Sequence, residues 1–534
     1  MISEELLIGK VISEENTPNP IEFGFQLLKK QENDFRLGEF VVTEGKPRIL
    51  ATVRQIVPQH LYYKPPLLVG TSLSEDFDLR EEAPPSASWT RAHANVLGEF
   101  GDLGFAFSGR SPWPGQRVRL ASELEIAQAL GLKPEGVHMG TLSFRPDVQV
   151  SLDPQVFMIE HIVTSGVTRW GKSYTNAVII EELAKAGRPV LIIDPHGEYY
   201  SFSVPNDQPS EIAGLPHDLE PRGFKTAIYS PPAFRESAER EMTVAFSDLE
   251  ASEILELTAI DGENQIALVY DCIRQLQGTQ YDVDGFIAKM KSVKDELKFS
   301  VAIESIFARL RVLQRGIGVF SQSAGQSFDP KELIVPQQIT VVNLSGLDLR
   351  AQQVLVTTLL RRLFYERQWG NIPPYAVAID EAQRFAPEGS DPVSKKVIEE
   401  LVKEGLKFGV NILAMSQRPT ELSHTIRAQA ETKIFHKLTE SADINYVAGL
   451  IEKVLPGMTE SITRLSKGEA VVIGGCTNYL PIRMRVRTRQ SKHAGRTGAL
   501  RLRKKIPNGP KHSTASTDVG IEALLEPRPI TSDN

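Results

Sequence analysis

Cysteine is almost absent from this chain, with only Cys272 and Cys476 among 534 residues. Two cysteines cannot make a disulfide framework, and alone they cannot supply the ligands of a zinc site. The sequence also lacks any run near the ~18 apolar residues that a membrane-spanning helix requires. Its first residues are acidic, without the basic and then apolar order of a secretory signal. We therefore expect a cytoplasmic, reduced protein without a membrane partner.

A positive net charge is missing as well, because 67 acidic residues outnumber 60 basic ones and give a formal charge of −7. Composition alone therefore does not indicate nucleic-acid binding. Basic residues do gather in an acid-free segment near the C-terminus, namely Arg485, Arg487, Arg489, Lys492, Arg496, Arg501, Arg503 and Lys504. Binding to phosphate backbones and a solvated tail without a partner both fit this segment.

The apolar pattern divides the chain into three parts. Short alternating runs over residues 1–150 predict a small N-terminal β-barrel, with a long loop or helical insert at 73–95. Residues 151–490 alternate continuous apolar runs with helix-like segments, which predicts an α/β fold whose parallel sheet is covered on both faces. Helix-like stretches at 247–276 and 284–314 predict a helical insertion over about 245–322. Residues 491–534 are expected to form a basic, disordered tail.

The most informative segment fits G-x-x-x-x-G-K-[ST], the phosphate-binding loop of nucleotide triphosphatases. An apolar, strand-like run at 157–163 precedes it and a predicted helix at 174–186 follows it, which is the context that the motif requires. Glycines let backbone N–H groups converge on phosphate, while Lys172 supplies a positive charge and Ser173 a hydroxyl for Mg²⁺. We expect ATP to contact Gly166, Val167, Thr168, Arg169, Trp170, Gly171, Lys172, Ser173 and Tyr174.

Hydrolysis needs further groups, and polar residues that follow later apolar strands can supply them. Residues 376–379 are apolar and lead into Asp380 and Glu381, at the sheet edge where open α/β folds bind ligands. We expect Asp380 to hold Mg²⁺ and Glu381 to orient and polarise the attacking water. Gln417 follows the next apolar strand, and its amide suits a sensor that contacts the γ-phosphate and the same water.

These motifs together resemble the HerA group of the FtsK–HerA translocase superfamily. In that family's order, the loop is followed by Asp-Pro-His-Gly-Glu-Tyr at 194–199, the Asp-Glu pair and Ser-Gln-Arg-Pro at 416–419. Asp194 and Glu198 are therefore secondary candidates for the nucleotide site. The resemblance implies a RecA-like P-loop NTPase core and a homohexameric ring that moves on duplex DNA by ATP hydrolysis. It also implies a partner nuclease of the NurA type, or another effector enzyme, in DNA-end processing or antiviral defence.

The chain departs from the family's usual residues at three places. Arg169 and Trp170 stand where the family's loop usually has Gly-Ser. Glu160 and Leu406 stand where the family usually has arginines that could reach a neighbouring subunit's ATP. The remaining candidates for an arginine finger are Arg169, Arg418 and Arg427.

Two other functions fit the same residues. A ring ATPase of this kind could move single-stranded DNA or protein, as secretion and conjugation ATPases do. If the unusual phosphate loop hydrolyses ATP poorly, the ring would instead be a nucleotide-dependent scaffold for a nuclease. ATPase assays with duplex DNA, with single-stranded DNA and without DNA separate these alternatives from a duplex translocase.

Overall fold

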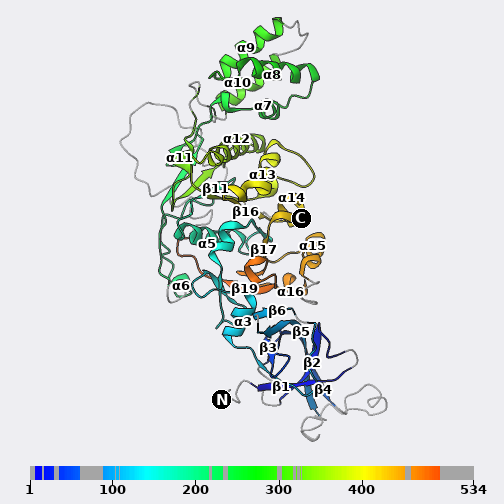
Figure 1. Cartoon of the computed structure of the whole chain (residues 1–534). Helices are drawn as coiled ribbons and strands as arrows, with labels where there is room; N and C mark the ends of the chain where they lie inside the picture. Colours follow the sequence, from blue (N-terminus) through cyan, green and yellow to red (C-terminus); the bar gives the residue numbers. More distant parts are fainter. Residues whose placement is uncertain are drawn as a thin grey trace, which may run out of the picture. The chain divides into compact units, whose positions relative to one another are not determined.

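The computed structural model describes residues 7–493 apart from 15–16, 29–34, 61–87, 103, 108, 216–218, 232–238, 297–303, 317–319, 321–324, 326 and 452–458. Residues up to 493 group into one unit, whose helices and strands are labelled in Figure 1. Most of the tail expected at 491–534 lies outside the described residues, which end at His493.

The N-terminal strands close into a barrel, as the sequence predicts. Six strands pair in the order β2-β1-β7-β3-β4-β5, β2 closes the ring on β5, and β6 extends β5. Apolar side chains such as Ile8, Phe23 and Val41 are fully buried in its core. The strands are β1 (Leu7–Ile12), β2 (Glu22–Leu27), β3 (Phe40–Thr43), β4 (Ile49–His60), β5 (Ser88–Gly101), β6 (Gly104–Ala106) and β7 (Arg117–Leu120).

Strand β5 corrects one expectation, because residues 88–95 were assigned to a loop or helical insert. Thr90, Ala92 and Ala94 are buried, whereas Arg91 and His93 between them are partly exposed. This period of two is that of a half-buried strand, and it outweighs the polar composition of the segment. The earlier part of the expected insert, residues 73–87, lies outside the described residues.

The second sheet forms the predicted RecA-like α/β core. Its order is β13-β12-β14-β11-β15-β16-β10-β17-β18-β19-β8-β9, parallel from β13 to β17 and antiparallel beyond. The domain boundary that the sequence places at residue 150 remains a prediction. Strands β8 and β9, which lie just before and at that position, pair within this second sheet. The strands are β8 (Val137–Leu142), β9 (Gln149–Leu152), β10 (Ile162–Ser165), β11 (Val190–Asp194), β12 (Thr226–Ser230), β13 (Arg240–Glu241), β14 (Ile339–Asn343), β15 (Tyr375–Ile379), β16 (Val410–Ser416), β17 (Thr432–Phe435), β18 (Glu469–Ile473) and β19 (Ile482–Val486).

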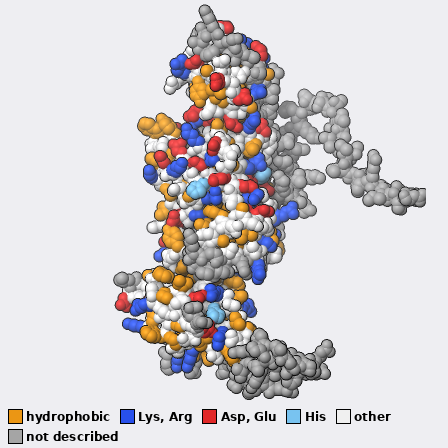
Figure 2. Space-filling model, turned by 90° about the vertical axis from the view of Figure 1, so that its right-hand side faces the viewer, with side chains coloured by type: hydrophobic (Ala, Val, Ile, Leu, Met, Phe, Trp, Pro, Cys, Tyr) orange, Lys and Arg blue, Asp and Glu red, His pale blue; other side chains and the backbone are white. Residues whose placement is uncertain are grey.

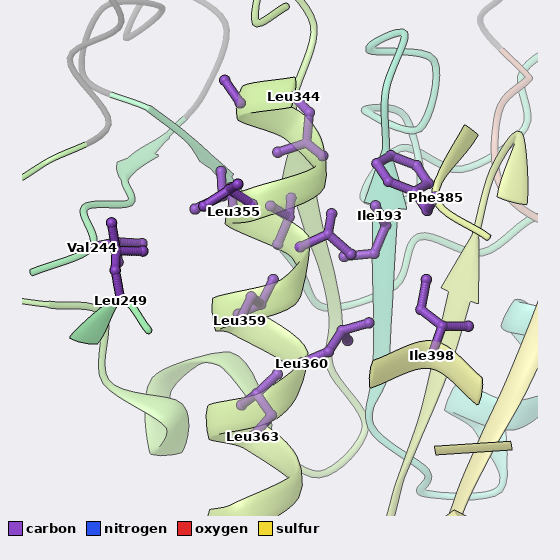
Figure 3. Packing of buried hydrophobic residues seen from close by; sticks show 14 of the residues in the cluster. Ile193, Val244, Leu249, Leu344, Leu355, Leu359, Leu360, Leu363, Phe385 and Ile398 are labelled. Atoms are coloured by element: carbon purple, nitrogen blue, oxygen red, sulfur yellow. The ribbon is translucent and has the colours of Figure 1, made fainter. Parts of the chain in front are cut away.

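Helices cover both faces of the parallel half of this sheet. One face packs on α12 (Leu349–Gln368) and α13 (Val393–Glu404), and Figure 3 shows leucines of α12 beside Ile193 of β11 and Ile398 of α13. The other face packs on α5 (Lys172–Lys185). Asp348 caps α12 by accepting from the backbone N–H of Ala351 at 2.9 Å, which fixes where the helix begins.

The remaining short helices connect the strands. No helix among the described residues is long and apolar enough to cross a bilayer. Besides α5, α12 and α13, the described α-helices outside the insertion are α3 (Glu123–Leu130), α4 (Pro154–Ile159), α6 (Pro209–Ile212), α11 (Pro330–Leu333), α14 (His424–Gln429), α15 (Ser441–Ile451) and α16 (Thr459–Thr463). The 3-10 helices are η5 (Phe246–Asp248), η6 (Ala382–Arg384), η7 (Gly405–Phe408), η8 (Pro419–Glu421) and η9 (Gly475–Thr477).

The helical insertion is present, but each of its two expected long helices is divided. The first becomes α7 (Ala251–Thr258) and α8 (Glu263–Leu276), because Ala259 adopts a left-handed φ of 47° and ends α7. The second becomes α9 (Val283–Glu296) and α10 (Glu304–Gly316), with residues 297–303 between them outside the described part. Figure 1 shows these helices grouped together.

The strand-like run before the phosphate loop is also shorter than expected. Residues 154–159 form α4, and β10 begins only at Ile162. Asp153 accepts from the backbone N–H of Gln155 at 2.9 Å, and Pro154 takes the first helical position. An Asp-Pro pair is a helix-start signal, and it overrides the apolar character of the residues that follow.

Candidate active site

The strand order brings the predicted chemical groups to one edge of the sheet. Strand β10, which leads into the phosphate loop, pairs with β16 on one side and with β17 on the other. Strand β15, which leads into Asp380 and Glu381, pairs with the far side of β16. Parallel strands end at a common edge, so Gln417 after β16 lies between the loop and the acidic pair.

The phosphate loop has the backbone that its sequence motif predicts. Gly166 and Gly171 adopt φ values of 155° and 117°, and α5 begins directly at Lys172. Arg169 adopts a φ of 70°, a conformation that glycine takes far more easily than arginine. The loop therefore opens onto the N-terminus of a 14-residue helix, which favours anions.

Glu381 gathers three partners at this edge. Nζ of Lys172 lies 3.4 Å from its Oε1, the Gln417 amide donates to the same oxygen at 2.8 Å, and Gln383 donates to Oε2 at 2.5 Å. Burial alone would raise the pKa of Glu381, but the charge of Lys172 and these amides lower it. Glu381 also has a left-handed φ of 47°, the kind of strain that functional sites often retain. The carboxylate is thus ionised and fixed in direction, as a water-orienting base requires.

Asp380 is buried and short of partners. Its Oδ1 is among the buried polar atoms that have no hydrogen bond. Burial, followed by the charges of Glu381 and Asp194, raises the pKa of Asp380 to about 8. A divalent cation would reverse that shift by compensating these acids. Mg²⁺ usually takes one or two carboxylates together with phosphates, so this donor set fits it, although the described residues hold no cluster of three or more His, Cys, Asp or Glu suited to a metal.

Asp194 has a different environment from Asp380. Its carboxylate accepts from the backbone N–H groups of His196, Gly197 and Tyr199 at 3.1, 2.7 and 3.0 Å, and it is 1% exposed. These bonds fold the turn at 194–199, and they place Glu198 near enough to Asp380 to raise its pKa further. In this structure Asp194 orders the turn, whereas Glu198 adds negative charge near Asp380.

Two of the three candidate arginine fingers, Arg418 and Arg427, have other partners in this structure. Arg418 lies 2.8 Å from Glu421 and 3.3 Å from Asp443. Arg427 donates to the Leu422 carbonyl at 2.8 Å and lies over the Tyr446 ring at 5.1 Å from its centroid. The structure therefore brings Lys172, Glu381 and Gln417 together, while both guanidinium groups contact the η8–α15 region.

Two residues that sequence reasoning missed lie beneath the site. His436 follows β17, is fully buried and contacts Thr175 of α5. Tyr199 is almost fully buried; its hydroxyl donates to the Met415 sulfur at 3.2 Å and bonds with Ser173. The only signal for His436 is a polar residue directly after an apolar strand, the same pattern that identified Gln417.

Two arginines of the basic C-terminal segment are buried inside the fold. Arg487 is 1% exposed at its side chain and lies 3.2 Å from Glu181 and 2.6 Å from Glu182, both on α5. Arg489 is also buried, over the rings of Tyr174 and Phe202. These two arginines stabilise the helix that follows the phosphate loop. The basic residues from Arg496 onward lie outside the described residues.

Comparison with known proteins identifies similar chains. Residues 137–363 match the family described as helicase HerA, central domain. The DNA double-strand break repair helicase HerA of Pyrococcus furiosus is 25% identical over 483 residues, which span 82% of this chain and 85% of that protein. HerA of Sulfolobus acidocaldarius is 27% identical over 72% of this chain and 75% of its own length. VirB4 of Thermoanaerobacter pseudethanolicus superposes with a TM-score of 0.49 at 11% identity, over 67% of this chain and 97% of VirB4.

Proposed function

We propose that this chain, a HerA-type P-loop ATPase, moves duplex DNA through a ring of identical subunits by Mg²⁺-dependent ATP hydrolysis. The observation that carries the chemical part is the contact of Lys172 and Gln417 with the same oxygen of Glu381. One cation, one base and one amide thus converge where the terminal phosphate of ATP would lie.

The residues divide the chemical work. Backbone N–H groups of 166–173 and the Lys172 ammonium bind the phosphates. Ser173 and Asp380 would hold Mg²⁺, which supplies charge compensation for the transferring phosphoryl group. Glu381 orients the attacking water and accepts its proton, and Gln417 holds both the water and the γ-phosphate in line.

The load is proposed to be duplex DNA, held through its phosphates. Support comes from the relatives, which are named DNA double-strand break repair helicases. On the face shown in Figure 2, acidic and basic side chains of the described residues are intermixed, and the net charge is −7. We therefore propose that a few basic side chains lining the pore of a homohexamer bind the DNA phosphates. The DNA affinity should then depend little on DNA sequence and strongly on salt.

The biological setting is proposed from the same likeness. A motor on DNA ends needs a second enzyme that cuts the strands it delivers, so we propose a nuclease partner of the NurA type or another effector enzyme. DNA-end processing and antiviral defence are the two settings that fit such a pair.

The experiment combines ATP turnover with assembly. We expect duplex DNA to stimulate turnover several-fold more than single-stranded DNA, Lys172→Ala to abolish ATP binding, and native mass measurement to give six subunits with nucleotide. Turnover indifferent to every nucleic acid would exclude a DNA motor and favour movement of protein. Stimulation by single strands alone would assign that load instead. Turnover no faster than that of Glu381→Gln would leave a nucleotide-dependent scaffold.

A further inference from the structure

The phosphate loop has two side walls, and the site described above uses only one of them. Strand β10 lies between β16 and β17, with Ser165 opposite Ser416 on one side and Phe435 on the other. The β16 wall carries Gln417 and faces Glu381. The β17 wall continues into His436 and Lys437, which no part of the hydrolytic chemistry requires.

Backbone hydrogen bonds join the phosphate loop to the residues that follow β17 and to the residue before β18. The N–H of His436 donates to Ser165 O at 2.8 Å, and the N–H of Val167 donates to Lys437 O at 3.0 Å. Farther along, the N–H of Gly468 donates to Trp170 O at 3.2 Å. The loop is therefore bonded to the β17 wall at its start and near its first glycine, and to the residue before β18 shortly before its second glycine.

The imidazole of His436 fills the space beneath the loop. A Cβ on Gly166 would lie 2.6 Å from His436 Cβ, and a Cβ on Gly171 would lie 3.3 Å from the ring. Nδ1 lies 2.8 Å from Glu469 O, and Nε2 lies 2.9 Å from Thr175 Oγ1. A carbonyl only accepts, so Nδ1 carries the proton and Nε2 accepts from the Thr175 hydroxyl. The ring thus joins β18 to the first turn of α5 beside Gly171, while Cβ and the backbone of His436 lie against Gly166.

Lys437 supports the bulkiest residue of the loop. Its Nζ lies 4.4 Å from the centroid of the Trp170 ring, within the range of a cation–π contact. Trp170 follows Arg169, whose left-handed φ of 70° is unfavourable for a residue with a side chain. A loop with two large residues at these positions needs support from outside, and the Lys437–Trp170 contact supplies it.

We propose that His436 and Lys437 are positioning residues that hold the phosphate loop in its cradle shape and thereby set the affinity for nucleotide. The β16 wall then sets the rate of hydrolysis, and the β17 wall sets binding. The reasoning is that converging N–H groups hold the phosphates equally in the ground state and the transition state, so a better-ordered cradle lowers Kd without changing kcat. This inference rests on the proposal that the loop binds ATP.

The test is a double-mutant cycle on nucleotide affinity, with Lys437→Met, Trp170→Leu and the pair combined. We expect each single variant to raise the Kd of a non-hydrolysable ATP analogue by roughly three- to tenfold. The combined variant should be no weaker than the worse single one, because both remove the same contact. Lys437→Arg keeps a cation over the ring and should restore most of the affinity. Turnover at saturating ATP should stay within about twofold in Lys437→Met and Lys437→Arg.

A second pair of variants tests the imidazole without removing it. Thr175→Val deletes the hydroxyl that donates to His436 and should raise Kd, whereas Thr175→Ser keeps the hydroxyl and should not. Lys331→Met, an exposed lysine on α11, is the matched control for loss of one positive charge. Melting temperatures of all variants show whether any effect is a general loss of folding.

The outcomes separate this inference from the proposed function. If Lys172→Ala still binds the analogue normally, the loop is not the nucleotide site and both fail. If Lys172→Ala abolishes binding but Lys437→Met and Thr175→Val bind like the unaltered protein, only the inference is overturned. It is also overturned if these variants lower kcat while Kd is unchanged, or if the Lys437 and Trp170 effects simply add.

Discussion

The ammonium of Lys172 and a carboxylate oxygen of Glu381 lie 3.4 Å apart, although 209 residues separate them in the chain. Their side chains are only 6% and 10% exposed, so each depends on the other for charge compensation. A triphosphate offers Lys172 a stronger partner. We expect binding to draw the lysine towards the phosphates and to free Glu381 Oε1 for a hydrogen bond from water.

Gln417 should act on rate rather than on affinity. Its amide donates to Glu381 at 2.8 Å, and in the proposed role it contacts the water and the phosphate together only when hydrolysis aligns them. We expect Gln417→Ala to lower kcat about 10²–10³-fold with little change in nucleotide Kd, as for the loss of one fixed donor to a transition state. Steady-state turnover and analogue binding measure the two quantities. A rise in Kd with normal kcat would assign Gln417 to binding instead.

Arg427 remains a candidate finger for a neighbouring subunit. We expect Arg427→Ala to lower turnover, by up to ~10³-fold if it reaches the transition state, without weakening nucleotide binding. Because Arg427 also donates to the Leu422 carbonyl, the melting temperature is measured alongside. Arg418→Ala is the companion variant from the same region. Unchanged turnover in either variant removes that arginine from the candidates.

Glu125 should make the stability of the α3 region depend on pH in the acidic range. Burial alone would raise its pKa, but hydrogen bonds from Arg119, Ser122 and Arg48 hold the pKa at about 2. The folded pKa lies below the unfolded value of about 4.3, so the contribution is complete above that pH and is lost as pH falls towards 2. We expect Glu125→Gln to cost about 2 kcal/mol at pH 7 and clearly less at pH 3. Urea unfolding at both values checks this, and a gap that does not narrow contradicts it.

Arg487 should matter for folding because it is buried against Glu181 and Glu182. We expect Arg487→Met to destabilise the protein by roughly 1.5–3 kcal/mol, since it removes the buried cation that bonds both glutamates and leaves Glu181 only Arg489 and Glu182 only Lys185. Arg485→Met is the matched control, because that side chain is 58% exposed and should change stability by less than about 0.5 kcal/mol. Thermal melting compares the two, and equal effects would show that burial of the pair is unimportant.

The sequence allowed prediction of residues whose identity and local pattern carry the chemistry. Lys172 lies in a motif with fixed spacing. The Asp380-Glu381 pair and Gln417 each come directly after an apolar strand, so sheet topology brings them to one edge. His436 and Arg487 could not be predicted, because their partners Thr175 and Glu181 lie 261 and 306 residues away. Such contacts depend on which strand neighbours which. The two-residue period of β5 and the Asp-Pro start of α4 are both present in the sequence. The prediction was wrong at these two places because it followed the composition of each segment instead.

The central claim is that Glu381 orients the water that cleaves ATP bound by the loop at Lys172. The most direct measurement compares Glu381→Gln with the unaltered protein in analogue binding and in single-turnover hydrolysis with duplex DNA and Mg²⁺. We predict unchanged nucleotide affinity and hydrolysis slowed about 10²–10⁴-fold. Hydrolysis at the normal rate in Glu381→Gln would contradict the account.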